Sequence, residues 1–291
     1  MKNKKFNKFI GLIVASSKFL KFILAGLSLS VYSYLFTWPF AIMLLLMIFI
    51  HEYGHVVAMR KCGIHVKGIY LIPFFGGVAV ADDNFKTRRD EAYIALMGPW
   101  YGFVVSAFFL LFYYLTKNPL FAAGATWCSM INLFNLFPIN PLDGGRILKS
   151  LAFSINNISG IVFLFLSLIA MFFLILYFKI WLFLILLIMA VLELFFEVYS
   201  INKKTKELEK LKNNLENKIN NTKTDLESLH YYKEKKIEVE NEINKTIKPQ
   251  MSLKQIILYS FLYLITCLFF LILASFSNHV PGCKEALDAF R

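Results

Sequence analysis

Charged residues are scarce in this chain. Only 17% of its 291 residues are Asp, Glu, Lys or Arg, whereas 58% are hydrophobic and the mean hydropathy is +0.59. Soluble domains usually contain about 25% charged and about 45–50% apolar residues. This shortage excludes an ordinary soluble domain and predicts a polytopic membrane protein that lies in a lipid bilayer.

Cysteine is also scarce, and its spacing is uninformative. The four cysteines lie in different segments and form no CxxC pair. This pattern excludes a disulfide framework and a thiolate zinc site. The net charge of +12 comes from basic residues beside apolar runs, and no nucleic-acid-binding motif is present. We therefore attribute the charge to a positive-inside bias and to anionic headgroups, and expect no nucleic-acid partner.

Seven apolar runs approach the roughly 20 residues that cross a bilayer. They are residues 22–36, 38–59, 92–115, 120–137, 158–178, 181–199 and 253–276. Basic residues gather between alternate runs, which predicts a cytoplasmic N-terminus in a prokaryotic cytoplasmic membrane. The basic N-terminus precedes an apolar stretch without a clear small-residue cleavage site, so we expect a retained signal anchor.

Histidine is rare too, yet two of the five histidines lie four residues apart. They belong to the pentad His51-Glu52-Tyr53-Gly54-His55, at the end of the second apolar run. On a helix both imidazoles share one face and can reach one metal ion, with Glu52 close enough to act as a base on a water molecule. Ionisable side chains at membrane depth are costly unless they are paired, metal-bound or hydrated. The pentad predicts a zinc site within the membrane, with His51 and His55 as ligands.

A catalytic zinc ion needs a third protein ligand besides these two histidines. The remaining histidines lie in poorly placed segments, whereas Asp143 lies in residues 135–146, near the same membrane face. Prolines there break the helix, and Gly144-Gly145 permits close backbone approach. On these residues alone, Asp143 is either a ligand turned into a cavity or a helix-capping residue in an interfacial turn.

Residues 63–83 join the second and third runs and are rich in Ile, Val, Tyr and Phe. Pro73 and the pair Gly76-Gly77 interrupt them, which predicts a short re-entrant β-hairpin. At membrane depth its backbone must be paired or face a protein cavity, and its edge could hold an extended substrate. An ordinary apolar loop is the alternative.

Residues 203–248 are dominated by Lys, Glu and Asn, with Leu and Ile at helical spacings. As one helix this segment would be roughly 70 Å long, yet both of its ends must return to the membrane. We expect a cytoplasmic coiled-coil-like segment or helical hairpin with its turn at 220–224; a helix along the membrane surface is the other arrangement. This segment either makes a contact with a partner or within a homo-oligomer, or it is only a solvated spacer.

Glu193 and Glu197 form another i, i+4 pair at the inner end of the sixth run. An ion path is one interpretation of this pair. We favour interfacial carboxylates near Lys203 and Lys204.

Two motifs occur together in this chain. The HExxH pentad is followed by N-x-x-P-x-x-x-x-D-G at Asn135, Pro138, Asp143 and Gly144, and this combination closely resembles the site-2 protease family of intramembrane zinc metalloproteases. The resemblance covers roughly residues 38–150. Gly76-Gly77 and Gly98-Pro99 also look like family features.

The resemblance implies a role for each matching residue. It implies His51, His55 and Asp143 as ligands of Zn²⁺ and Glu52 as catalytic base and acid. It also implies that Asn135 positions the substrate or stabilises the oxyanion. We assign Gly76 and Gly77 to substrate binding. The family's substrates are transmembrane segments, and its fold is a three-helix catalytic core with peripheral helices.

We therefore expect an all-α polytopic membrane protein with a site-2-protease-like core, a short re-entrant β-hairpin and a cytoplasmic coiled-coil or helical-hairpin insert. The expected segments are 1–37 (basic N-terminus and first helix), 38–156 (catalytic core), 157–200 (two peripheral helices), 201–250 (coiled segment) and 251–291 (last helix and outer tail). Neither a PDZ-sized insert nor a nucleotide-binding module is visible in the sequence.

The expected function is hydrolysis of peptide bonds in transmembrane segments or membrane-bound peptides, either in regulated intramembrane proteolysis or in processing of signal or secreted peptides. The alternative is a metal transporter or a catalytically silent membrane scaffold with a retained zinc site. Glu52 argues against this alternative, because a transport or structural site has no need of a base beside the metal.

Overall fold

The computed structural model describes residues 2–74, 76–81, 85–179, 182–221, 226–247, 251–276, 279–281 and 283. The described elements are α1 (Lys2–Leu35), α2 (Trp38–Lys61), β1 (Val66–Ile72), β2 (Gly76–Ala81), α3 (Arg88–Thr116), α4 (Pro119–Asn135), α5 (Asp143–Ile155), α6 (Asn157–Phe178), α7 (Leu182–Asn221), α8 (Leu226–Ile247) and α9 (Leu253–Phe276). They form two compact units. Unit 1 comprises Met1–Lys86, Tyr93–Phe137 and Phe261–Arg291, and unit 2 comprises Thr87–Ala92 and Pro138–Ser260.

Each apolar run falls largely within a helix of the structure. Within the described residues, five helices are long and apolar enough to cross a membrane, namely α2, α3, α6, α7 and α9. The first run lies in the short apolar stretch Phe19–Leu35 of α1, and the fourth lies in α4, which has only 17 residues. Large apolar side chains remain exposed on the long helices, for example Phe173 at 62% and Leu264 at 64%. Exposed apolar surface of this extent suits lipid contact, so the predicted polytopic helical fold is confirmed.

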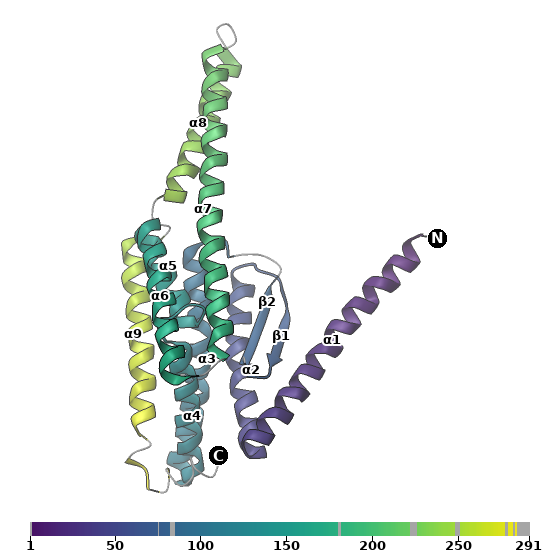
Figure 1. Ribbon diagram of the computed structural model, residues 1–291, viewed down its shortest axis with the longest axis vertical. Coiled ribbons are helices and arrows are strands. Elements are labelled where there is room, and N and C mark those ends of the chain that lie inside the picture. The colour runs from purple at the N-terminus through teal and green to yellow at the C-terminus, as the bar shows by residue number, and fades with distance from the viewer. Residues whose placement is uncertain are drawn as a thin grey trace. The chain divides into compact units, whose positions relative to one another are not determined.

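The hairpin predicted after the second run is present in unit 1. Strands β1 and β2 pair antiparallel, with Ile72 opposite Gly76 at the closed end. The turn begins at Pro73, and both Phe74 (φ 66°) and Gly76 (φ 84°) adopt positive φ. Buried residues of α2 and α3 pack under the hairpin, which lies beside α2 in Figure 1. Residues 82–84, at the end of the predicted segment, lie outside the described residues.

In unit 2, α7 continues without a break from the sixth apolar run into the Lys- and Glu-rich segment. Helix α8 lies alongside it (Figure 1). The buried apolar residues between them are Leu208, Leu215 and Val239. Two ion pairs join the helices, Lys212–Glu240 at 3.1 Å and Lys236–Glu216 at 2.9 Å. Because the numbers rise on one helix as they fall on the other, the pair is an antiparallel helical hairpin, one of the two expected arrangements. Of the turn predicted at 220–224, residues 220 and 221 still belong to α7, and residues 222–224 lie outside the described residues.

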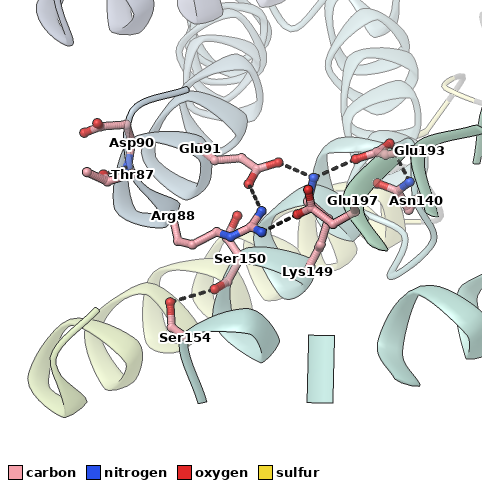
Figure 2. Close-up of polar contacts among 10 residues, drawn as sticks. All are labelled: Thr87, Arg88, Asp90, Glu91, Asn140, Lys149, Ser150, Ser154, Glu193 and Glu197. Atoms are coloured by element: carbon pink, nitrogen blue, oxygen red, sulfur yellow. Dashed lines mark hydrogen bonds and ion pairs between the residues drawn. The ribbon is translucent and has the colours of Figure 1, made fainter. Parts of the chain in front are cut away.

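Unit 2 also corrects the interpretation of Glu193 and Glu197. These carboxylates pair with residues of α3 and α5 in a largely buried cluster of ion pairs, and not with the nearby Lys203 and Lys204 (Figure 2). The sequence did not indicate these ion pairs because the cationic partners, Arg88 and Lys149, are more than 40 residues away in the chain.

Candidate metal centre

The two histidines of the pentad lie on one face of α2, one turn apart. This helix begins after Thr37 with Pro39 in its first turn, and it ends with Arg60 and Lys61, which complement the helix dipole. Polar though they are, His51, Glu52 and His55 are only 5%, 8% and 5% exposed. Buried polar groups need partners, so the hydrogen bonds of these side chains define what the site can do.

Hydrogen bonds determine which ring nitrogen of each histidine carries the proton. His55 Nδ1 donates to the carbonyl oxygen of Ile94 at 2.7 Å. His51 Nδ1 lies 2.9 Å from Asn132 Oδ1, and the same amide donates through Nδ2 to the carbonyl of Cys128 at 2.8 Å. That second bond fixes the amide orientation, so Oδ1 is the acceptor and His51 Nδ1 is the donor. With Nδ1 as the donor, each imidazole can present Nε2 as a lone-pair donor for a metal.

The two Nε2 atoms converge, with only 3.1 Å between them. At this distance the two nitrogens need either a proton or a metal cation between them, because two facing lone pairs repel each other. Nitrogens bound at about 2.0–2.1 Å to a tetrahedral zinc ion lie about 3.3 Å apart, close to the observed separation. A metal-binding histidine also commonly donates its other nitrogen to a carbonyl or carboxylate, as both histidines do here to an oxygen acceptor. The histidine pair thus fits Zn²⁺.

Helix α3 packs closely against the two imidazoles at Gly98. A β-carbon on Gly98 would overlap His55 Nε2 and would lie only 2.7 Å from His51 Nε2. Gly98 of the Gly98-Pro99 pair singled out in the sequence therefore has a steric reason, because any larger residue there would displace the ring nitrogens.

Glu52 lies against the β-hairpin. A β-carbon on Gly77 of β2 would overlap Glu52 Cγ and would lie 3.1 Å from Oε1. The absence of a side chain at Gly77 thus allows the strand to approach this carboxylate. Gly76 differs, because a β-carbon there would meet nothing within 4 Å, and its contribution is the positive φ of the turn.

Asp143 belongs to unit 2, where it is the first residue of α5 and is 7% exposed. The extended residue before it, Leu142, is the N-cap, so Asp143 is not the capping residue. A carboxylate in the first turn of a helix is favoured by the helix dipole. Gly145 packs directly on the backbone of Ile139 and Asn140, which confirms the close approach predicted from the paired glycines.

The two asparagines of α4 differ in their surroundings. Asn135 is the last residue of the helix and is half-buried, and within the described chain its side chain makes no hydrogen bond. Asn132, which the sequence analysis missed, is 2% exposed and orients His51. Asn132 could have been noticed in the sequence as an amide within an apolar helix, because a buried amide needs a hydrogen-bond partner.

Replacing Asn132 with Ala is expected to weaken zinc binding about 10–100-fold, because His51 loses the acceptor that fixes its tautomer. Competition of purified protein with a zinc chelator measures the affinity. Ser129→Ala is the matched control, since this buried hydroxyl on the same helix donates only to the carbonyl of Ala125. Equal affinities for wild type and Asn132→Ala would show that the amide does not support the site.

Comparison with known proteins agrees with these observations. Residues 39–123 match the model of peptidase family M50. The chain is 32% identical over 139 residues to zinc metalloprotease MJ0392 of Methanocaldococcus jannaschii, a match that covers 46% of this chain and 40% of that protein. It is 33% identical over 118 residues to the putative zinc metalloprotease Rip3 of Mycobacterium tuberculosis, with coverages of 38% and 30%. With stage IV sporulation protein FB of Bacillus subtilis the identity is 31% over 109 residues, with coverages of 36% and 37%.

The predicted resemblance is therefore confirmed at the level of a family match. The matched segment contains the histidine pair, Glu52 and the hairpin, and it ends before Asn135 and Asp143. The chain spans less than half of the length of each of these relatives.

Proposed function

We propose that this chain, whose residues 39–123 match peptidase family M50, is a zinc-dependent endopeptidase that cleaves transmembrane segments or membrane-bound peptides. One observation carries the proposal. Two buried imidazoles, each held by a hydrogen bond at Nδ1, direct their Nε2 atoms to a common point, and Glu52 follows His51 directly on the same helix turn.

The proposed ligands are His51, His55 and Asp143, which could together hold one metal ion. Two imidazoles and one carboxylate are a usual ligand set for catalytic zinc, which keeps a fourth position for water or substrate. The buried position of Asp143 at the start of α5 supports this assignment, because a buried carboxylate needs a cation or several donors.

When bound, zinc would polarise the scissile carbonyl and lower the pKa of a water molecule towards neutrality. Glu52 takes the proton of the attacking water and passes it to the leaving amine nitrogen. Asn135 donates its side-chain amide to the oxyanion that develops on the substrate, or holds the substrate in place. The half-buried position of Asn135 leaves its amide without an internal partner among the described residues, which suits such a role.

A helical substrate hides its carbonyl groups in hydrogen bonds to the residue four positions on, so it must unwind before attack. Strand β2 offers an edge on which the opened stretch can lie extended. Gly77 supports this assignment because it packs against Glu52, and an extended peptide paired near it would pass the base. Gly76 contributes through the turn that begins β2.

The proposed setting is a prokaryotic cytoplasmic membrane, with the N-terminus and the α7–α8 hairpin on the cytoplasmic side. The peptide products belong either to regulated proteolysis or to signal and secreted peptide processing. The hairpin provides a contact for a partner or for a second copy of the chain.

Reconstitution in liposomes with a single-span peptide tests the function. Zinc-loaded protein is expected to cleave the peptide, and removal of zinc with a chelator is expected to abolish cleavage until zinc is restored. A zinc-sensitive dye inside the same liposomes tests the alternative. Metal flux without cleavage would identify a transporter, and zinc binding with neither activity would identify a silent scaffold.

A further inference from the structure

Within unit 2, a cluster of ion pairs joins the first turn of α3 to α5 and α7 (Figure 2). Lys149 of α5 is 4% exposed, and its ammonium contacts Glu91 of α3 and Glu193 of α7, the latter at 2.6 Å. Arg88 pairs with Glu91 at 3.1 Å and also with Glu197. Burial opposes the charged form of Lys149, but the carboxylates of Glu91 and Glu193 outweigh this effect and raise its pKa above the ordinary value. The cation therefore stays charged at neutral pH and orients the carboxylates around it.

Glu193 uses its two oxygens for different partners. Oε1 accepts from Lys149, whereas Oε2 accepts from Asn140 Nδ2 at 2.7 Å. Asn140 is 1% exposed, and its backbone N–H donates to Ser167 Oγ of α6 at 2.7 Å. The residue is thus held from α6 through its backbone and from α7 through its side chain.

Asn140 is connected to Asp143 by a short, closed turn. Leu142 N–H donates to the carbonyl of Ile139 at 3.0 Å, and Arg146 N–H donates to the carbonyl of Leu142 at 2.9 Å. Gly145 packs against the backbone of Asn140 from the other side. A displacement of Asn140 therefore moves the first turn of α5, which begins with Asp143.

We infer that Glu193 is a positioning residue that, through Asn140, sets the place of the Asp143 carboxylate. This inference rests on the proposed function, in which Asp143 is a zinc ligand. Lys149 holds the Glu193 carboxylate in the orientation that Asn140 needs. Glu197, one turn further along α7, pairs with Arg88 and has no contact with the turn at 139–142 within the cluster of Figure 2.

Zinc affinity of four purified variants tests this role. Glu193→Leu and Asn140→Ala are each expected to raise the zinc dissociation constant about tenfold, the lower end of the effect of residues that support metal ligands. Because both act through one contact, the double variant is expected to show about the same tenfold change instead of a hundredfold change. Glu197→Leu, the matched control, also removes a carboxylate of the cluster, and it is expected to change the constant less than twofold.

The alternative outcomes are distinct. Equal losses in Glu193→Leu and Glu197→Leu, or additive effects in the double variant, would reduce the cluster to a general scaffold and overturn the inference. If Glu193→Leu does not fold, Asn140→Ala is the deciding variant, because it leaves the Lys149–Glu193 pair intact. An unchanged zinc affinity in Asn140→Ala would then overturn the inference. Wild-type protein that binds no zinc would refute the proposed function and the inference together, whereas zinc-binding wild type with unaltered variants would refute only the inference.

Discussion

Glu52→Gln is expected to lower peptide cleavage at least a hundredfold while zinc binding is retained. General acid–base catalysis contributes about 10²–10⁴-fold to rates, and the amide keeps the shape of the side chain but cannot accept the proton of water. The substitution also preserves the packing against Gly77. Cleavage of a single-span peptide in liposomes measures the rate, and elemental mass spectrometry measures the zinc content.

The matched control for this prediction is Glu209→Gln, the same substitution at an exposed position of α7 in the helical hairpin. It should cleave at the wild-type rate. A Glu52→Gln protein that cleaves within tenfold of wild type would exclude Glu52 as the base and would require another proton acceptor at the site.

Asp143→Ala is expected to lower zinc affinity more than about a hundredfold, because loss of a direct ligand exceeds the 10–100-fold effect of a supporting residue. The start of α5 should retain its backbone, because Asp143 is not the N-cap and the substitution removes no capping side chain. Zinc content after dialysis against a weak chelator gives the first measurement, and competition titration gives the dissociation constant.

Asp90→Ala controls for the loss of an acidic residue from the first turn of a helix, because Asp90 occupies the first turn of α3. It should retain full zinc occupancy. Full occupancy in Asp143→Ala as well would remove Asp143 from the site and leave the third ligand to be found.

Local pattern was sufficient to predict the histidine pair and the hairpin. The four-residue spacing of His51 and His55 has one geometric consequence on any helix, and the apolar run indicates that they lie on one. Pro73 and Gly76 mark a turn whatever surrounds them, because proline and glycine restrict or permit particular φ values. The helical hairpin was predicted for a similar reason, since a polar segment of this length between two spans must return to the membrane.

The supporting contacts could not be predicted from the sequence in this way. The role of Asn132 depends on which face of α4 meets α2, and an apolar helix has too weak a polarity pattern to indicate this face. Glu193 was assigned to the interface because Lys203 and Lys204 are near it in sequence, whereas its partner Lys149 is 44 residues away. Ion pairs of this kind are set by tertiary packing, so only the structure reveals them.

The most direct test of the account is mass spectrometry of membrane peptides from cells that carry Glu52→Gln in place of the wild-type chain. We expect uncut transmembrane or signal-type peptides to accumulate in the variant, and their shortened products to appear only in wild-type cells. Identical peptide inventories in the two strains, with the protein present and zinc-loaded in both, would contradict the assignment of this chain as an intramembrane protease.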